Sequence, residues 1–377
     1  MDLSNLKPED VKVVDDDLAV ILAQTIAKYE SDSGKTLQPA HIERLIINTY
    51  AYREALTRQQ VNEAYRQQHV RFATGLMLDL CGDDVNTPRL EASAARCTLR
   101  FTGQALRSEV DIPTGTQVAV GEIVFATIEP GRLTAARPRV DLQAVCLTSG
   151  PAGNGWSVGQ INTLQGVFAA DVSAVNITVP SGGAGTESDA AYRARIMLAP
   201  ESYSVAGPVG AYEYWARAVS PAICAVHVGH ALDEKNEEIG GTVAVTVLTK
   251  TGMPSEELLA QVKTALSAER KRPLCDTVVV RAPTEVKYTL VAELVLLTGT
   301  NALDAKTAAE QAWAAYEAAK QEQLGSDIVQ LDIQTALKVA GVYDVKLTSP
   351  ASRVLKPYEW AKCTSVRITT RVEQEDG

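Results

Sequence analysis

Residues 1–70 carry two helical patterns of apolar positions. In the first, apolar side chains recur every three or four residues, as on one face of a helix: Leu18, Ile21, Leu22, Ile26 and Tyr29. The second runs from about Pro39 to Val70 without an internal Gly or Pro, and its later half is rich in Arg, Gln and Glu. A long helix with one narrow apolar stripe is rarely stable by itself. We therefore expect it to pack on helices of its own chain or of another subunit.

From residue 96 to about residue 180 the apolar period becomes two. Alternating segments occur at 97–101, 118–120, 123–127 and 140–147, with Pro113 to Gly115 as a turn between them. Strand and turn signals recur about every ten residues, which is typical of a small β-sandwich or barrel.

Beyond residue 207 strands and helices alternate. Strands are expected at 223–228, 242–248, 277–280, 286–297, 342–347 and 366–368, and helices at 210–219, 254–266, 305–323 and 328–340. The pattern predicts two α/β subdomains. The fold class is thus a multidomain α+β protein with N-terminal long helices, a central small β-sandwich or barrel-like domain and C-terminal α/β subdomains. The expected parts are 1–95, 96–181, 182–206, 207–282 and 283–377.

Between the β region and these subdomains lies a glycine-rich segment that leads into a helix. Gly182, Gly183 and Gly185 allow a backbone with positive φ or a close approach to another strand. Thr186, followed three residues later by Asp189, resembles a capping box, and Glu187 is expected in the first turn, where the helix dipole favours acids. We expect Thr186 and Glu187 as the cap and Arg193 and Arg195 as a structural pair on the helix.

Charge and cysteine usage exclude several classes of protein. The formal net charge of −10 argues against a protein that mainly grips a phosphate backbone. Six scattered cysteines without a Cys-x-x-Cys pair are typical of reduced thiols in a cytosolic protein. The N-terminus has no signal-peptide pattern, and the most apolar run, 288–297, is too short to span a bilayer. We expect neither nucleic acid nor membrane as a partner.

Candidate catalytic and metal motifs are weak. Ser157 lies in a Gly-x-Ser-x-Gly pattern, but a loop precedes it and no helix start follows, whereas a nucleophile elbow needs a strand and a helix. His227 and His230 would point to opposite faces of a strand and lack further ligands. Asp15 to Asp17 fit a helix start better than a cation site. We expect no catalytic residues, metal or cofactor. A hydrolase using Ser157 and a carbohydrate-binding protein remain the alternatives.

A series of motifs resembles the J-like baseplate wedge proteins of contractile-tailed bacteriophages and related contractile bacteriocins. The motifs occur in order over residues 40–350: 45–64, 73–79 with Arg89, 97–101, 112–116, 150–159, 175–176, 182–196, 219–223, 254–266, 325–328 and 341–345. At Ala222 this chain departs from the Pro-Gly-Val that the family often has, so the turn there is expected to differ.

The resemblance implies a structural role, not an enzymatic one. It implies a virion protein of the tail baseplate, assembled in the host cytoplasm, of which two copies join a helical tail-wedge subunit. Six wedges would close around the hub and spike proteins and contact the sheath initiator. The long helix would then supply the subunit interface, through Leu45, Ile46, Thr49, Tyr52, Arg53, Leu56 and Tyr65. Gly182, Gly183 and Gly185 would act as a hinge when the baseplate rearranges.

Overall fold

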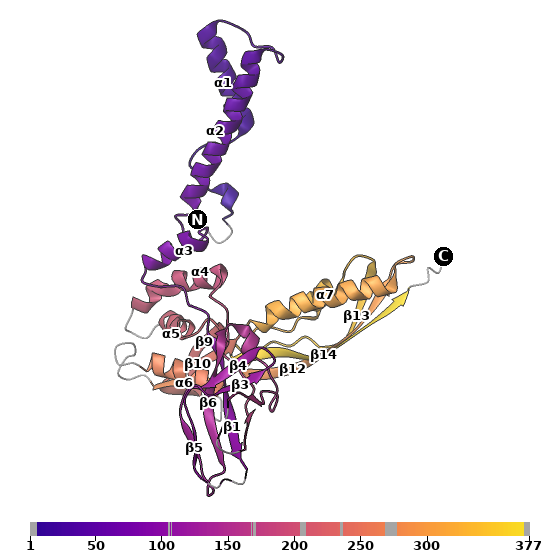
Figure 1. The fold of residues 1–377 in the computed structure, drawn as a ribbon. Coiled ribbons are helices and arrows are strands. Elements are labelled where there is room, and N and C mark those ends of the chain that lie inside the picture. Colours follow the sequence, from indigo (N-terminus) through magenta and orange to yellow (C-terminus); the bar gives the residue numbers. More distant parts are fainter. Residues whose placement is uncertain are drawn as a thin grey trace. The chain divides into compact units, whose positions relative to one another are not determined.

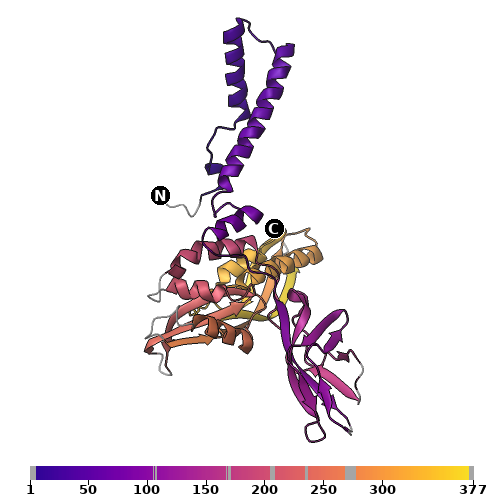
Figure 2. The same ribbon diagram turned by 60° about the vertical axis from the view of Figure 1, so that its left-hand side comes forward.

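The chain divides into two compact units (Figures 1 and 2), seen in a computed structural model. The first consists of Met1–Arg89 with Ser188–Met197, and the second of Leu90–Glu187 with Leu198–Gly377. The structure describes residues 6–104, 106, 108–166, 168, 171–203, 209–233, 237–267 and 277–372. The segment expected as one part at 182–206 thus contributes to both units, and its residues 204–206 lie outside the described ranges.

The first unit is built on a helical hairpin of α1 (Leu18–Ser33) and α2 (Ile42–Arg66), preceded by the short η1 (Pro8–Asp10). Asp17 caps α1, because its carboxylate accepts a hydrogen bond from the Ala19 amide at 2.7 Å. Gly34 ends the helix in the left-handed conformation, with φ of 68°. The acidic run at 15–17 is thus a helix start, as expected.

Two further helices complete this unit. They are α3 (Gly75–Asp83) and α4 (Asp189–Leu198), which packs against α3 although more than 100 residues separate them in the sequence. Tyr192 and Ile196 of α4 are buried with Ala73 and Leu78 in one apolar cluster. Tyr192 and Ile196, which are four residues apart, therefore lie on the same face of α4.

The second unit begins with an antiparallel, barrel-like sheet of strand order β7-β3-β4-β6-β1-β8. Its strands are β1 (Ala94–Gly103), β3 (Gln117–Val120), β4 (Ile123–Thr127), β6 (Arg139–Ser149), β7 (Thr163–Leu164) and β8 (Val172–Asn176), and a separate ladder joins β2 (Val110–Ile112) to β5 (Gly131–Leu133). Ile161 and Asn176, beside the two edge strands, exchange hydrogen bonds of 2.9 and 3.1 Å. Leu99, Phe101 and Phe125 are fully buried inside.

Two three-stranded α/β parts follow. In the first, η3 (Ala199–Tyr203), α5 (Val209–Arg217) and α6 (Glu256–Leu266) accompany a sheet of order β11-β10-β9, formed by β9 (Ile223–Leu232), β10 (Glu238–Thr249) and β11 (Thr277–Arg281). In the second, α7 (Ala302–Gln321) and α8 (Gln330–Leu337) accompany the order β13-β12-β14, formed by β12 (Thr284–Leu296), β13 (Val342–Ser349) and β14 (Glu359–Val372). Each central strand has one parallel and one antiparallel neighbour.

The expected fold class is confirmed. The sequence pattern did not single out β2, β5 and β7 as strands, because two or three residues are too few to show a period. The helix expected at 328–340 spans eight residues, and the strand expected at 366–368 is part of β14, which extends over fourteen. No helix among the described residues combines the length and the apolarity needed to cross a bilayer.

Candidate functional site

One side of α2 is covered by its own chain. Ile47, Ala51 and Ala55 are buried, and the last two form a small cluster with Ile21 and Leu22 of α1. At about 100° per residue, Arg58, Asn62 and Arg66 continue this side toward the end of the helix. Because Ala51 and Ala55 are small, α1 can approach closely, but the contact buries little apolar area.

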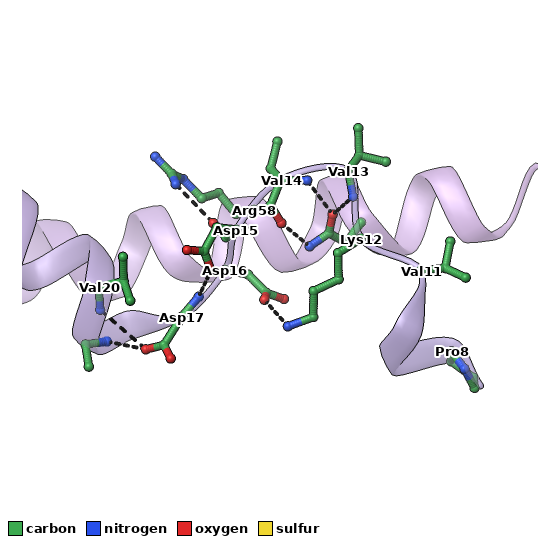
Figure 3. Close-up of polar contacts among 12 residues, drawn as sticks. Pro8, Val11, Lys12, Val13, Val14, Asp15, Asp16, Asp17, Val20 and Arg58 are labelled. Carbon is green, nitrogen blue, oxygen red and sulfur yellow. Dashed lines mark hydrogen bonds and ion pairs between the residues drawn. The ribbon is translucent and has the colours of Figure 1, made fainter. Parts of the chain in front are cut away.

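Polar contacts hold the segment that precedes α1 along the second half of α2 (Figure 3). The Asn62 side chain is fully buried: its Oδ1 accepts hydrogen bonds from the amides of Val13 at 2.8 Å and Val14 at 3.1 Å, and its Nδ2 donates to the Val14 carbonyl at 2.9 Å. One helical turn away on either side, Arg58 donates to the Asp15 carbonyl and Arg66 to that of Val11. The buried carboxamide of Asn62 thus supplies the backbone of residues 13 and 14 with hydrogen-bond partners of the kind that a neighbouring strand would offer.

The opposite side of α2 is apolar and exposed. Ile42 is 73% exposed, Leu45 60%, Tyr52 53% and Leu56 36%, and Thr49 between them is also exposed. Steps of three, four, three and four residues separate these five positions, which is the heptad spacing of a coiled-coil seam. We call Ile42, Leu45, Thr49, Tyr52 and Leu56 the α2 seam.

The structure thus gathers four of the seven sequence-predicted interface residues into the α2 seam: Leu45, Thr49, Tyr52 and Leu56. Ile46 and Arg53 flank it and are exposed. Tyr65 lies instead at the angle of Ile47, with its ring centroid 4.9 Å from that of His69. Sequence reasoning missed Ile42, which extends the same spacing by one step toward the start of the helix.

A second group of functional candidates fastens α4 to α3. Arg89 donates to Asp79 of α3 at 2.7 Å and to Asp189 of α4 at 2.8 Å, and its guanidinium lies 4.6 Å from the centre of the Tyr192 ring. The other oxygen of Asp189 accepts from the Gly75 amide at 2.9 Å. This bond and the Arg89 contact lower the pKa of the Asp189 carboxyl. The motifs at 73–89 and 182–196 therefore meet in one polar clamp.

Arg193 and Arg195 both serve this clamp through backbone carbonyls. Arg193 donates to Val70 at 2.8 Å and to Ala73 at 2.6 Å, and the buried Arg195 donates to Pro88 at 2.6 Å. Fork-shaped guanidinium groups suit this task because each has several donors in a fixed plane. The two arginines thus tie α4 to the loops on either side of α3.

The cap of α4 differs from the expected one. The helix begins at Asp189, and Ser188 occupies the capping position, with its Oγ 3.4 Å from the Ala191 amide. Thr186 is exposed and lies two residues too early to cap. Glu187 precedes the helix: its backbone amide donates to the Leu90 carbonyl at 3.0 Å, and its carboxylate accepts from the Leu90 amide at 3.1 Å.

The glycine segment pairs with the start of β1. Gly182 has φ of 84° and its carbonyl accepts from the Ser93 hydroxyl at 2.8 Å. A side chain at Gly183 would meet the Gly150 carbonyl oxygen, and Asn154 bonds both the amide and the carbonyl of Gly183. Ala184 and Ser93 exchange backbone bonds of 2.9 and 3.0 Å. Gly185, in contrast, is exposed, and a side chain there would meet no atom within 4 Å.

The candidate nucleophile Ser157 and the candidate metal ligands His227 and His230 do not form a catalytic or metal-binding arrangement with other described residues. Ser157 follows the short η2 (Pro151–Gly153) and precedes a turn, so it lacks the strand and helix of a nucleophile elbow. His227 and His230 lie on β9. The pKa of His227 is lowered mainly by burial and to a smaller extent by the positive charge of the nearby Arg281. Within the described ranges, no three His, Cys, Asp or Glu side chains gather in a metal-binding geometry.

Comparisons with known proteins match this organisation. Four family profiles match successive segments: the baseplate J-like protein N-terminal domain at 44–96, the barrel domain at 98–183, the central domain at 204–282 and the C-terminal domain at 288–369. Baseplate protein J of Escherichia phage P2 is 37% identical over 196 residues, which are 51% of this chain and 62% of that protein. The alignment thus spans less than two thirds of that relative.

One solved structure was also matched. A chain in the cryo-EM structure of the anti-feeding prophage baseplate, 6-fold symmetrised, gives a TM-score of 0.39 at 12% identity, over 93% of this chain and 90% of that one. The four profiles follow one another from residue 44 to residue 369 in N-terminal, barrel, central and C-terminal order. The chain therefore belongs to the baseplate J-like family, whose members are structural proteins of phage-type tail baseplates.

Proposed function

We propose that this chain is a wedge component of the baseplate and that the α2 seam is where it joins helices of other subunits. The observation that carries the proposal is the heptad-spaced row of exposed apolar side chains from Ile42 to Leu56, opposite the side that α1 covers. A facing helix would bury such a row by inserting its own side chains between those of the row.

Covering the α2 seam would bury apolar side chains that the chain itself leaves exposed. Full burial of one Leu or Ile side chain contributes about 1.5–3 kcal/mol. Ile42 and Leu45 keep more than half of their surface exposed, so a helical partner would add substantial apolar burial to that of the contact with α1.

The partners in this proposal are a second copy of the chain and a helical tail-wedge subunit, which would form a helical bundle with α2. Six such wedges would then surround the hub and spike proteins and meet the sheath initiator. The chain's similarity to phage P2 baseplate protein J supports a role in a baseplate, within which this arrangement is our proposal.

The experiment replaces two seam residues and follows assembly. Leu45→Glu with Leu56→Glu places charges in the seam while leaving the covered side of α2 untouched. We expect the purified variant to fold normally, as judged by circular dichroism, and to be lost from assembled tail particles. Val61→Glu with Tyr50→Glu is the matched control, because both residues are exposed apolar positions on α2 away from the seam. Equal incorporation of the seam variant and the control would overturn the proposal.

We further propose that baseplate rearrangement bends the ribbon of residues 90–93 and 184–187. Backbone pairs fix its two ends, Ser93 with Ala184 and Leu90 with Glu187, whereas Gly185 and Thr186 between them are exposed. This narrows the predicted three-glycine hinge to Gly185, because contacts with the Ser93 and Asn154 side chains hold Gly182 and Gly183.

Gly185→Ala is the clean test of this hinge. The added methyl meets nothing in the folded chain, so assembly should continue, but the narrower backbone freedom should slow sheath contraction. Gly183→Ala is unsuitable because its methyl would collide with the Gly150 carbonyl. Contraction at the normal rate in Gly185→Ala particles would contradict the hinge.

A further inference from the structure

Four arginines line one shallow hollow on the barrel, in a chain of net charge −10. The hollow has a volume of about 410 Å³, and Arg100, Arg132, Arg137 and Arg139 line it with Val140 and Asp141. Arg100 comes from β1, Arg132 from β5, and Arg139 and Asp141 from β6, so three strands place cations at one spot. A local cluster of this kind creates a positive field within an acidic molecule.

Two of these arginines are already paired with carboxylates. Arg100 lies opposite Asp141 across the β1–β6 ladder and donates to both of its oxygens, each at 2.7 Å. Arg132 donates to Asp111 at 2.6 Å and to Glu109 at 2.9 Å. Bidentate geometry of this kind is what the guanidinium group offers to carboxylates.

The other two arginines have open donors. The side chains of Arg137 and Arg139 make no hydrogen bond or ion pair with any residue in the described ranges, and both are exposed. Their backbone is nevertheless fixed: Thr134 and Arg137 exchange backbone bonds of 3.0 Å, and the Pro138 carbonyl between the two arginines accepts from the Gly103 amide at 2.9 Å. Two unpaired guanidinium groups are thus presented from an ordered hairpin.

We propose that this hollow binds the carboxylates of an acidic protein segment from a neighbouring subunit, with Arg137 and Arg139 as the donors. The charge count favours this ligand. The three carboxylates of Asp111, Glu109 and Asp141 offset three of the four cations, so the excess of positive charge is small. A small excess, presented by two open guanidinium groups, matches the one or two carboxylates of a short acidic segment better than the dense charge of a phosphate polymer.

The identity of the partner as a baseplate subunit rests on the proposed function, but binding of carboxylates does not. The first experiment therefore uses the isolated full chain and a fluorescein-labelled hexaglutamate peptide, with binding followed by anisotropy at low salt. Arg137→Ser with Arg139→Ser should weaken binding about tenfold or more, because it removes both open guanidinium groups. Added salt should weaken the wild-type binding as well.

Arg367→Ser with Arg371→Ser is the matched control. These two arginines of β14 are also exposed, and their loss changes the net charge equally. The control should bind the peptide within about twofold of wild type, since general attraction between exposed charges is weak. Equal weakening in both double variants would show general electrostatics and would overturn the proposal.

Binding of two other anionic ligands, inorganic phosphate and vesicles containing phosphatidylglycerol, is measured in parallel with the peptide. Binding of either that depends on Arg137 and Arg139, without binding of hexaglutamate, would also overturn the proposal and assign the hollow to phosphate. Loss of peptide binding in the double variant with unchanged particle assembly would overturn the assignment of the acidic segment to a neighbouring subunit. Failure of the α2 seam variants would leave this peptide measurement unaffected, so the two proposals can fail separately.

Discussion

The helical hairpin and the barrel differ in how much of their apolar side-chain surface is buried within the chain. In the barrel, Leu99, Phe101 and Phe125 are fully buried within one large apolar cluster. In the hairpin, the corresponding cluster consists of Ile21, Ala51 and Ala55 with the partly buried Leu22, while larger apolar residues of α2 face solvent. The barrel thus has a large apolar core within the chain, whereas the hairpin has a small one and leaves large apolar side chains of α2 exposed.

The difference shows two ways in which parts of one chain keep their shape. The barrel relies on a large apolar core, whereas the hairpin relies on small apolar residues and polar contacts. The Asn62 and Arg58 contacts fix the segment before α1 without using apolar area. The apolar side chains of the α2 seam are left exposed, and under our proposal they are available to another subunit.

The largest expected effect is a difference in the free energy of unfolding between a substitution in the barrel and one in the α2 seam. Phe101→Ala leaves a cavity in the barrel and should cost about 3–5 kcal/mol of its free energy of unfolding. Leu45→Ala, on the exposed seam, should change the free energy of unfolding of the isolated chain by less than about 0.5 kcal/mol. Hydrogen exchange of β1 and α2 amides measures the two effects separately. A similar loss for both variants would contradict the comparison.

A smaller effect is expected at Asn62. Asn62→Leu removes the buried acceptor of the Val13 and Val14 amides and the donor to the Val14 carbonyl, which should cost about 1–3 kcal/mol of local stability. Faster hydrogen exchange in residues 11–17 would report it. Asn48→Leu is the matched control, because Asn48 is an exposed asparagine on the same helix. Unchanged exchange in Asn62→Leu would show that the segment is held by something else.

Acid should loosen the clamp between α3 and α4. The folded-state pKa of Asp189 is lowered, first by the Gly75 amide and then with help from Arg89. Its stabilising contribution is therefore present above the unfolded-state value of about 3.9 and is lost as the pH falls through the folded pKa. The effect is modest because the carboxylate is partly exposed and screened.

Limited proteolysis of α4 between about pH 5 and pH 2.5 tests this prediction, over the window in which an Asp with a lowered pKa titrates. Wild-type cleavage should rise toward the acid end, and Asp189→Asn should show a smaller rise because the titrating group is gone. Asp32→Asn, which alters an exposed pair with Lys28 on α1, should behave as wild type. An identical acid profile in Asp189→Asn would assign the transition to other groups.

The smallest effect concerns the start of α4. Ser188→Ala should destabilise the helix by about 0.5–1 kcal/mol, because the cap accepts at a long 3.4 Å, whereas Thr186→Ala should have almost no effect. Exchange of the first α4 amides distinguishes the two. A larger effect from Thr186→Ala would restore the capping position first predicted from the sequence.

Much of the fold and part of the candidate site could be predicted from the sequence. Helical periodicity is local and visible in a single chain, so the apolar pattern of α2 could be read from the sequence. The family resemblance pointed to Leu45, Thr49, Tyr52 and Leu56 as interface residues, and their role in an interface stays a prediction. The series of motifs was enough to indicate the J-like family before any contact was known. Short strands such as β5 and β7 escaped because their pairing partners, not their own composition, make them strands.

The sequence by itself determined the helices, the β region, the family and the apolar spacing along α2, because period, turn residues and charge act over a few neighbouring positions. The tertiary structure decided that α4 belongs with α3, that Asn62 and not an apolar residue anchors the segment before α1, and that Arg137 and Arg139 share a hollow with Arg100. These outcomes depend on which distant segments meet. The identity of an arginine or asparagine in the sequence does not reveal whether its side chain binds water, a carbonyl or a carboxylate.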